Sequence, residues 1–247
     1  MPASTLAYTA VCVFIAAVVR GFSGFGFALL SISSVSMVLP PAIVVPTMWI
    51  LDFVAGVNLL PSIYRDVRWR SIAWLVGAAV IATPFGVYAL ANAPTAWMRI
   101  ALAILVLVSA VVLLSGFQLK REPGVAGSIA TGLSAGLLNG SLGIGGPPII
   151  VFYLGSPIAI AAGRASMIAA FLAMDLTGMP TILAFGLVGM EVLKLIAVCV
   201  PALVIGIFVG SRLVGRLDPA KVRRVLLYLL MGMALAIGAQ GVAGLAG

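Results

Sequence analysis

Two stretches decide the fold: Gly21-Phe22-Ser23-Gly24-Phe25-Gly26 and Gly140-Ser141-Leu142-Gly143-Ile144-Gly145. Both follow the pattern G-x-x-G-[FI]-G, and the second lies 119 positions after the first. Glycines at this density let the chain leave a helix and leave backbone amides exposed at the start of the next one. Close packing of helices through small residues is the alternative for single glycines. It does not explain a paired break in both halves of the chain.

The composition around these breaks is that of a membrane protein. Of the 247 residues, 63% are hydrophobic and 8% are charged, whereas about 25% of an ordinary soluble domain is charged. The mean hydropathy is +1.27. So few polar residues cannot cover a surface that faces water, and most of the surface must face lipid. The composition excludes a soluble globule and leaves no extramembrane domain of useful size.

The apolar stretches form two successive series of five. The first series covers about residues 6–19, 25–39, 42–63, 72–91 and 100–117. The second series covers about residues 129–138, 147–154, 165–185, 192–209 and 225–239. Asp52 and Asp175 recur at an offset of 123, and Arg99 and Arg223 at an offset of 124. The sequence therefore predicts an internal duplication.

This duplication predicts an all-α integral membrane protein made of two repeats. We expect a single transmembrane transporter domain over residues 1–247, with repeat one at about 1–120 and repeat two at about 121–247. The first 35 residues of each half are too long for one straight span, so each half begins with two half-helices that form a glycine-broken hairpin. Three transmembrane helices follow each hairpin.

An odd number of full spans in each half predicts that the repeats are inverted, as in many secondary transporters. The basic residues test this parity, because cytoplasmic loops are enriched in Lys and Arg. With inverted repeats, the extracytoplasmic side collects the loop residues Arg99 and Lys194. The cytoplasmic side collects eleven others: Arg65, Arg68, Arg70, Lys120, Arg121, Arg164, Arg212, Arg216, Lys221, Arg223 and Arg224. The opposite parity divides the same charges almost evenly. Both termini are therefore expected on the periplasmic side.

The two breaks are the expected binding site, because an exposed helix N-terminus attracts anions. Arg20 precedes the first break after a long apolar run, and a charged side chain at that depth needs a partner. The equivalent position holds Asn139. The alternative role for Arg20 is a structural ion pair with Asp52. The candidate substrate-binding residues are Arg20, Gly21, Ser23, Gly24, Gly26, Asn139, Gly140, Ser141, Gly143, Gly145 and Gly146.

Asp52 and Asp175 are candidate coupling residues because each lies near the middle of an apolar stretch. Burial favours the neutral form of a carboxyl group and a nearby cation favours the charged form, which allows a switch linked to protons. A static partner for Arg20, or a group that caps a helix, is the alternative. The sequence contains no histidine to carry protons instead.

Other functions find little support in the residues. Without histidine, the Gly21-Phe22-Ser23-Gly24 motif cannot form the Ser-His pair of a serine protease. Neither glycine cluster carries the Lys-Ser/Thr of a P-loop. Cys12 and Cys199 lie in apolar runs and are expected to be packing residues, so no metal site is predicted. The net charge of +8 comes from loops that orient helices, which argues against nucleic-acid binding.

At the two breaks, the two aspartates and the duplicated arrangement, the chain resembles the TauE/SafE family of sulfite and organosulfonate exporters. The segments that carry the resemblance are residues 20–27, residues 139–148 (NGSLGIGGPP), and the stretches around Asp52 and Asp175. The resemblance implies a carrier of the cell inner membrane that exports a small anion such as sulfite or sulfoacetate without a cofactor.

The function expected from these observations is export of a small anion by alternating access, with a site where the two breaks cross. Arg20, Asn139, Ser23, Ser141 and nearby amides would hold the anion, and Asp52 or Asp175 would couple its movement to protons. A passive anion channel with the same site is the alternative, and an intramembrane enzyme is a more distant one. The expected partners are the anion and membrane lipid, with a homodimer left open.

Overall fold

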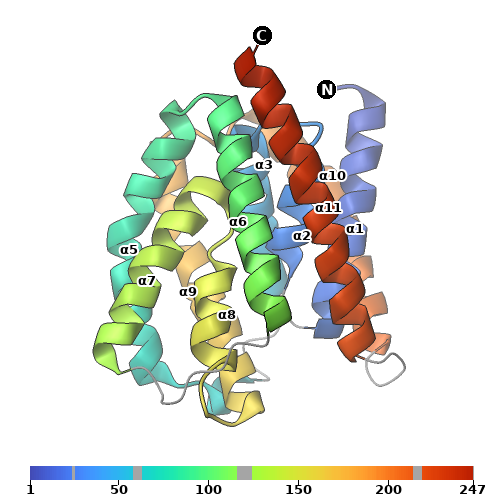
Figure 1. The fold of residues 1–247 in the computed structure, drawn as a ribbon. Helices are drawn as coiled ribbons and strands as arrows, with labels where there is room; N and C mark the ends of the chain where they lie inside the picture. Colours follow the sequence, from blue (N-terminus) through green and yellow to red (C-terminus); the bar gives the residue numbers. More distant parts are fainter. Residues whose placement is uncertain (24–25, 58–62, 116–123, 214–218, 247) are drawn as a thin grey trace. The chain divides into compact units, whose positions relative to one another are not determined.

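The computed structural model describes residues 1–23, 26–57, 63–115, 124–213 and 219–246, and the secondary structure of these residues is entirely helical (Figure 1). The elements are α1 (Ala3–Ser23), α2 (Phe27–Val35), α3 (Pro41–Val57), the 3₁₀ helix η1 (Tyr64–Asp66), α5 (Trp69–Asn92), α6 (Thr95–Ser115), α7 (Val125–Leu142), α8 (Gly146–Leu154), α9 (Ile160–Ala184), α10 (Met190–Arg212) and α11 (Pro219–Ala246).

Each of the ten apolar stretches corresponds to one of these α-helices, which confirms the all-α prediction. In the described residues, six helices are long and apolar enough to cross a membrane. They are Ala3–Phe22, Trp69–Asn92, Thr95–Ser115, Ala161–Ala184, Met190–Arg212 and Arg224–Leu245. The protein is therefore a multi-pass integral membrane protein.

The helix boundaries repeat with the same offset as the glycine motif. α1 ends at Ser23 and α7 ends at Leu142, which are 119 positions apart. α2 and α8 have nine residues each, and their bounds are also shifted by 119. α6 and α11 start 124 positions apart, which is the offset of Arg99 and Arg223. These helix bounds thus follow the same offsets as the sequence motifs, although α6 and α11 differ in length, with 21 and 28 residues.

The breaks themselves have the backbone conformation that glycine permits. Gly26, which precedes α2, has a φ of 91°, and Gly143, which follows α7, has a φ of 69°. Residues with a β-carbon rarely adopt these angles. The chain therefore leaves one helix and starts another where the sequence predicted it.

The limbs of each hairpin differ in length, which departs from the expectation of two half-helices. α1 has 21 residues and is long enough to cross a membrane by itself, and α7 has 18. The nine-residue α2 and α8 have the length of half-helices. The first helix continues through Arg20 and Gly21 because a cation is favourable at a helix C-terminus and because a neighbouring helix packs on the glycine.

The packing divides the chain into two compact units, and each unit takes helices from both repeats. Unit 1 consists of Met1–Leu51, Ala93–Ser115 and Val188–Gly247, and unit 2 consists of Asp52–Asn92 and Gly116–Leu187. Unit 1 thus contains α1, α2, α6, α10 and α11, whereas unit 2 contains α5, α7, α8 and α9. α3 contributes its first part to unit 1 and its end to unit 2.

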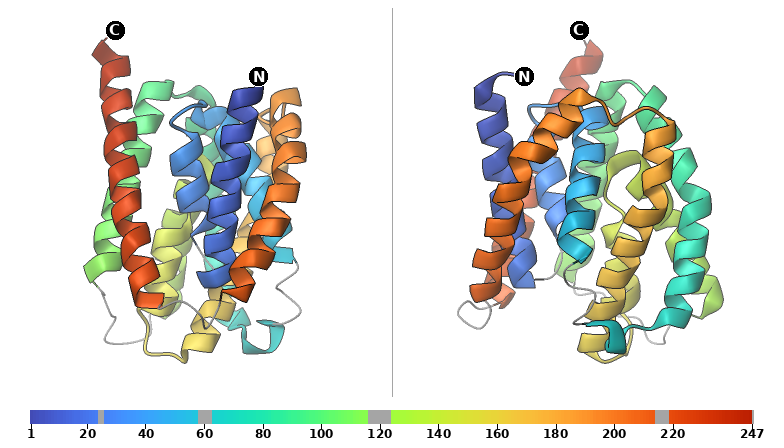
Figure 2. Two further views of the ribbon diagram at one scale, coloured as in Figure 1. Left: turned by 90° about the vertical axis from the view of Figure 1, so that its right-hand side faces the viewer. Right: turned by 180° about the vertical axis from the view of Figure 1, so that it is seen from behind.

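In each unit, the two most closely packed helices meet through a pair of glycines. In unit 1, α1 lies beside α10 (Figure 2), and a β-carbon at Gly21 would collide with the α10 backbone and lie 3.1 Å from the Cα of Gly210. In unit 2, a β-carbon at Gly140 of α7 would collide with α5 and lie 3.1 Å from the Cα of Gly86. Larger residues would separate the backbones. Both pairs bring together helices from different repeats.

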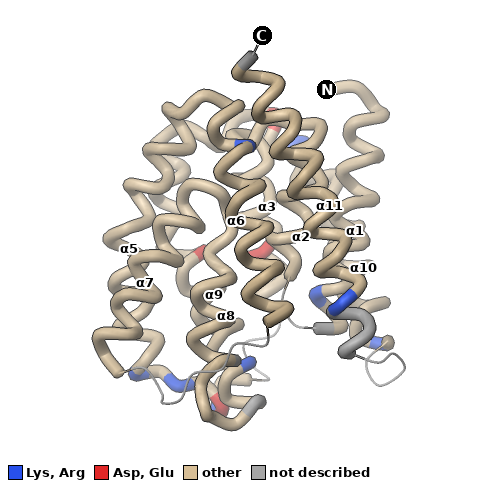
Figure 3. The backbone as a smooth tube through the Cα atoms, viewed as in Figure 1, with Lys and Arg blue, Asp and Glu red and all other residues tan. Residues whose placement is uncertain are grey.

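The outward faces of the helices are apolar, and the charges lie mostly at helix ends and in connections (Figure 3). Ile81 and Phe85 on α5 expose 66% and 67% of their surface, and Leu235 on α11 exposes 64%. Such a surface is suited to lipid rather than water.

Candidate functional site

The first break, in unit 1, follows a buried cation and precedes a short helix. Arg20 is 5% exposed and lies in the last turn of α1. Because α1 begins at Ala3, this is about 25 Å along the helix. Ser23 is the last residue of α1, and Gly24 lies outside the described residues. Gly21 serves the contact with α10, and Gly26 provides the turn into α2.

The start of α2 has the features of an anion-binding helix end. No side chain caps it, and its first bond within the helix joins the Leu30 amide to the Gly26 carbonyl. The amides of residues 27–29 precede that bond and have no partner within the helix. The helix dipole adds partial positive charge at this end. Unit 1 therefore carries an arginine in the last turn of α1 and an uncapped start of α2 on the two sides of the first break.

The second break, in unit 2, is built similarly but offers less positive potential. Asn139 is 8% exposed, and its position before the break is the one that Arg20 occupies in the first repeat. The Ser141 hydroxyl donates to the Leu137 carbonyl at 2.8 Å, so its own helix already uses it. Pro147 and Pro148 follow the start of α8, and proline has no amide hydrogen to donate. The two breaks are therefore chemically unequal, as Arg20 and Asn139 at equivalent positions already indicated.

Unit 2 packs its break against the helix that carries Asp175. A β-carbon at Gly145 would lie 2.8 Å from the Ala135 carbonyl, 3.0 Å from the β-carbon of Asn139 and 3.3 Å from the Met174 side chain of α9. One at Gly146 would lie 3.6 Å from the Phe171 ring of α9. Because Met174 directly precedes Asp175, the carboxylate belongs to the turn of α9 that supports the break.

Both candidate coupling carboxylates are buried in the protein. Asp52 on α3 is 9% exposed and Asp175 on α9 is 5% exposed. By contrast, the carboxylates of Asp66 and Glu191 belong to exposed residues at helix ends. A buried carboxylate costs free energy unless it is paired or protonated. Both aspartates fall in unit 2, whereas Arg20 falls in unit 1, and the ion pair between Arg20 and Asp52 stays a prediction.

Sequence reasoning missed three buried hydrogen-bond donors in unit 1. Ser33 and Ser36 are 0% exposed and Trp49 is 3% exposed. In the described part of the chain, the two hydroxyls and the indole nitrogen have no hydrogen-bond partner. Burying such a group unsatisfied costs about 1–3 kcal/mol. The available signal was the density of serine in the stretch SISSVS, residues 31–36, of an apolar segment.

The described residues contain no group of three or more His, Cys, Asp and Glu side chains that could hold a metal ion. The candidate residues are an arginine and backbone amides in unit 1, and an asparagine and two carboxylates in unit 2. These groups can bind an oxyanion and exchange a proton.

Comparison with known proteins gives two matches. The model of the family described as Sulfite exporter TauE/SafE matches residues 9–237. A protein of Cupriavidus necator, described as a probable sulfite/organosulfonate exporter TauE, is 25% identical over 222 residues. The matched region covers 87% of this chain and 85% of that protein. No solved structure matches the chain.

Proposed function

The chain belongs to the sulfite exporter TauE/SafE family, and on that premise we propose that it exports sulfite or a small organosulfonate such as sulfoacetate. Proteins of this family are transporters, not enzymes. The Gly21-Phe22-Ser23-Gly24 sequence is therefore not a protease motif. We infer the substrate class from the first break, where a buried arginine precedes an uncapped helix start.

The anion binds at this first break in our proposal. Arg20 supplies a planar guanidinium whose N–H groups match the oxygens of an oxyanion. The amides at the start of α2 supply further donors. The sulfur oxyanions and sulfonates share a compact negative head with several acceptor oxygens, which this set of donors suits. In unit 2, Asn139 and the α7–α8 break carry neutral hydrogen-bonding groups only.

Alternating access and proton coupling complete the proposal. Inverted repeats give a carrier two equivalent states that open to opposite sides. The inversion is supported within unit 1, where α6 and α11, the last helices of the two repeats, pack antiparallel. Gly238 of α11 faces Ala103 of α6, and Gly244 faces Ala96, nearer the start of α6. In this proposal, Asp175 is the residue that couples the movement of the anion to protons.

Liposomes that contain the purified protein test the function. Vesicles preloaded with unlabelled sulfite should transiently accumulate labelled sulfite above its equilibrium level, because a carrier exchanges its substrate. A channel would only equilibrate the label. Sulfite or sulfoacetate should also raise the melting temperature, whereas an anion that is not bound should not. If sulfite, sulfoacetate, taurine and thiosulfate give neither counterflow nor stabilisation, the proposed substrate class is wrong.

Inner-membrane localisation with both termini in the periplasm is a further part of the proposal. In a background without Cys12 and Cys199, we expect an impermeant thiol reagent added from the periplasmic side to label Ser4→Cys and Gly244→Cys. Arg68→Cys should be labelled only after the membrane is permeabilised, because the basic residues mark the cytoplasmic side. Labelling of position 68 but of neither terminus in intact cells would reverse the orientation. Homodimer formation and specific lipid binding stay predictions.

A further inference from the structure

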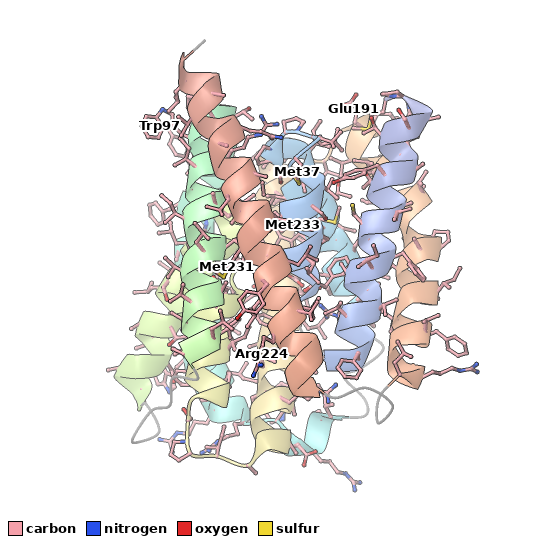
Figure 4. The ribbon with its side chains drawn as sticks, turned by 45° about the vertical axis from the view of Figure 1, so that its right-hand side comes forward. Met37, Trp97, Glu191, Arg224, Met231 and Met233 are labelled. Atoms are coloured by element: carbon pink, nitrogen blue, oxygen red, sulfur yellow. The ribbon has the colours of Figure 1, made fainter. Side chains whose placement is uncertain are left out.

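The short helix α2 and Ser36, the residue that follows it with a helical backbone conformation, are buried and rich in serine. Ser31, Ser33 and Ser36 are 0% exposed, and Ser34 is 5% exposed. α2 contacts α1, α6 and α11 within unit 1. Figure 4 shows α2 between α1 and α11, with Met37 in the turn that follows α2. Four hydroxyls in so apolar a setting need an explanation, because each loses its contact with water.

The four serines form two pairs, which differ in the hydrogen bonds that their hydroxyls make. Ser31 donates to the Phe27 carbonyl at 2.6 Å, and Ser34 donates to the Leu30 carbonyl at 2.7 Å. These are the usual bonds of serine to its own helix. Ser33 and Ser36 make no such bond, and no other described group takes their place. One pair is therefore satisfied by the helix, and the other requires a partner from elsewhere.

Helical geometry places the two pairs on opposite faces of α2. Residues three apart share a face, and successive residues turn by about 100°. Ser33 and Ser36 thus present two hydroxyls in a row on one face, whereas Ser31 and Ser34 lie on the other. The equivalent positions of α8 are Phe152 and Gly155, which have no hydroxyl. The feature is specific to the first repeat.

We propose that Ser33 and Ser36 form a second anion subsite, in which their hydroxyls donate hydrogen bonds to the oxygens of a sulfur oxyanion or sulfonate. This inference rests on the proposed function. Ser33 lies about 9 Å along the helix from Phe27, so a small anion at the start of α2 does not reach it. The anion moves between the break and the serine pair, and α2 forms one wall of its path.

A hydroxyl pair suits a position that an anion must leave again. The serines carry no charge, so they satisfy the anion's oxygens without holding it as strongly as an arginine does. Transport requires that each position bind well enough to be occupied and weakly enough to be vacated. Arg20 and the serine pair would thus act in sequence along the same short helix.

The matched pairs of serines provide the experiment and its control. Ser33→Ala/Ser36→Ala should raise the sulfite concentration for half-maximal transport at least tenfold, measured in liposomes from the concentration dependence of counterflow. Its melting temperature without sulfite should not fall, because the substitution removes buried groups that have no partner. Ser31→Ala/Ser34→Ala changes the same residue type in the same helix, and should leave the half-maximal concentration within twofold of the wild-type value.

The outcomes separate this inference from the proposed function. If the wild-type protein shows no saturable sulfite transport, the proposed function fails. If wild-type transport is saturable and Ser33→Ala/Ser36→Ala matches it, the serine subsite is wrong, and buried water would then satisfy the hydroxyls. Equal losses in both double variants would also overturn the subsite. Should the double variant fold poorly, the single variants Ser33→Ala and Ser36→Ala give the same comparison.

Discussion

Arg20→Ala should abolish saturable binding of sulfite, and Arg20→Lys should weaken binding without removing it. Arg20 is 5% exposed, and it precedes the break that leads into α2. Hydrogen bonds to a charged group are worth about 1.5–3 kcal/mol each, so the loss of two should weaken binding by about 100-fold or more. Lysine keeps the charge but loses the planar arrangement of donors.

The competing explanation is that Arg20 only stabilises the fold, by complementing the dipole of α1 or by pairing with Asp52. Arg212 provides the control, because it lies in the last turn of α10, the helix that packs beside α1. It is exposed, and its guanidinium lies 4.1 Å from the centre of the Phe208 ring. Arg212→Ala removes an arginine from the same position in a helix without touching a break.

Binding and folding are measured separately in these variants. Sulfite affinity comes from the shift of the melting temperature with sulfite concentration, and folding from the melting temperature in its absence. Arg212→Ala should keep wild-type affinity. A well-folded Arg20→Ala protein that binds sulfite as tightly as the wild type would assign Arg20 to the fold alone.

The helices and their order could be predicted from the sequence because hydropathy dominates the folding of a membrane chain. A buried backbone in lipid must form helices, so ten apolar stretches became ten helices within the described residues. The breaks were predictable for a similar reason, since Gly26 and Gly143 take backbone angles that glycine allows most easily. Both the helices and the breaks could therefore be predicted from residues that are close together in the sequence.

The pairing of helices needed the structure because it depends on residues far apart in the chain. Gly86 and Gly210 looked like ordinary glycines within apolar stretches, yet they contact Gly140 and Gly21. They lie 124 positions apart, the offset of the later elements, while Gly21 and Gly140 lie 119 apart. These two matching offsets were the signal available in the sequence. They predict the glycine contacts only if the first helix of each repeat packs against a helix of the other repeat.

The charged candidate residues were visible in the sequence, whereas the unpartnered hydroxyls of Ser33 and Ser36 were not. Arg20, Asp52 and Asp175 are conspicuous because ionisable groups are rare and costly in apolar stretches. A serine in a membrane helix usually bonds to its own backbone, so sequence alone could not separate Ser33 and Ser36 from their neighbours. The inequality of the two breaks was visible in Arg20 and Asn139 at equivalent positions, and the prolines after the second break add to it.

The second large effect is expected at Asp175, where Asp175→Asn should retain exchange of sulfite but lose its response to a pH gradient. Asparagine keeps the shape and hydrogen-bonding capacity of the side chain and removes its titration. Asp175 is 5% exposed, and the preceding Met174 lies at the α7–α8 break. A change in its charge can therefore act on the packing of that break.

The size of the effect follows from the energy in a proton gradient. A pH difference of one unit corresponds to about 1.4 kcal/mol per proton, so a carrier that moves one proton with each anion can reach about a tenfold change in accumulation per unit. The wild-type protein should show such a change, and Asp175→Asn should show less than a twofold change. Counterflow without a gradient should persist in the variant, because exchange does not require net proton movement.

Other carboxylates separate coupling at Asp175 from a general effect of lost charge. Glu191→Gln alters an exposed carboxylate at the start of α10 and should leave the pH response intact. Asp52→Asn is expected to impair folding or anion binding, since Asp52 is the carboxylate of the repeat that carries Arg20. It should therefore lower counterflow itself. If Asp175→Asn transports sulfite with the full wild-type response to a pH gradient, the coupling proton is carried by another group, and the buried carboxylate of α9 has a structural role.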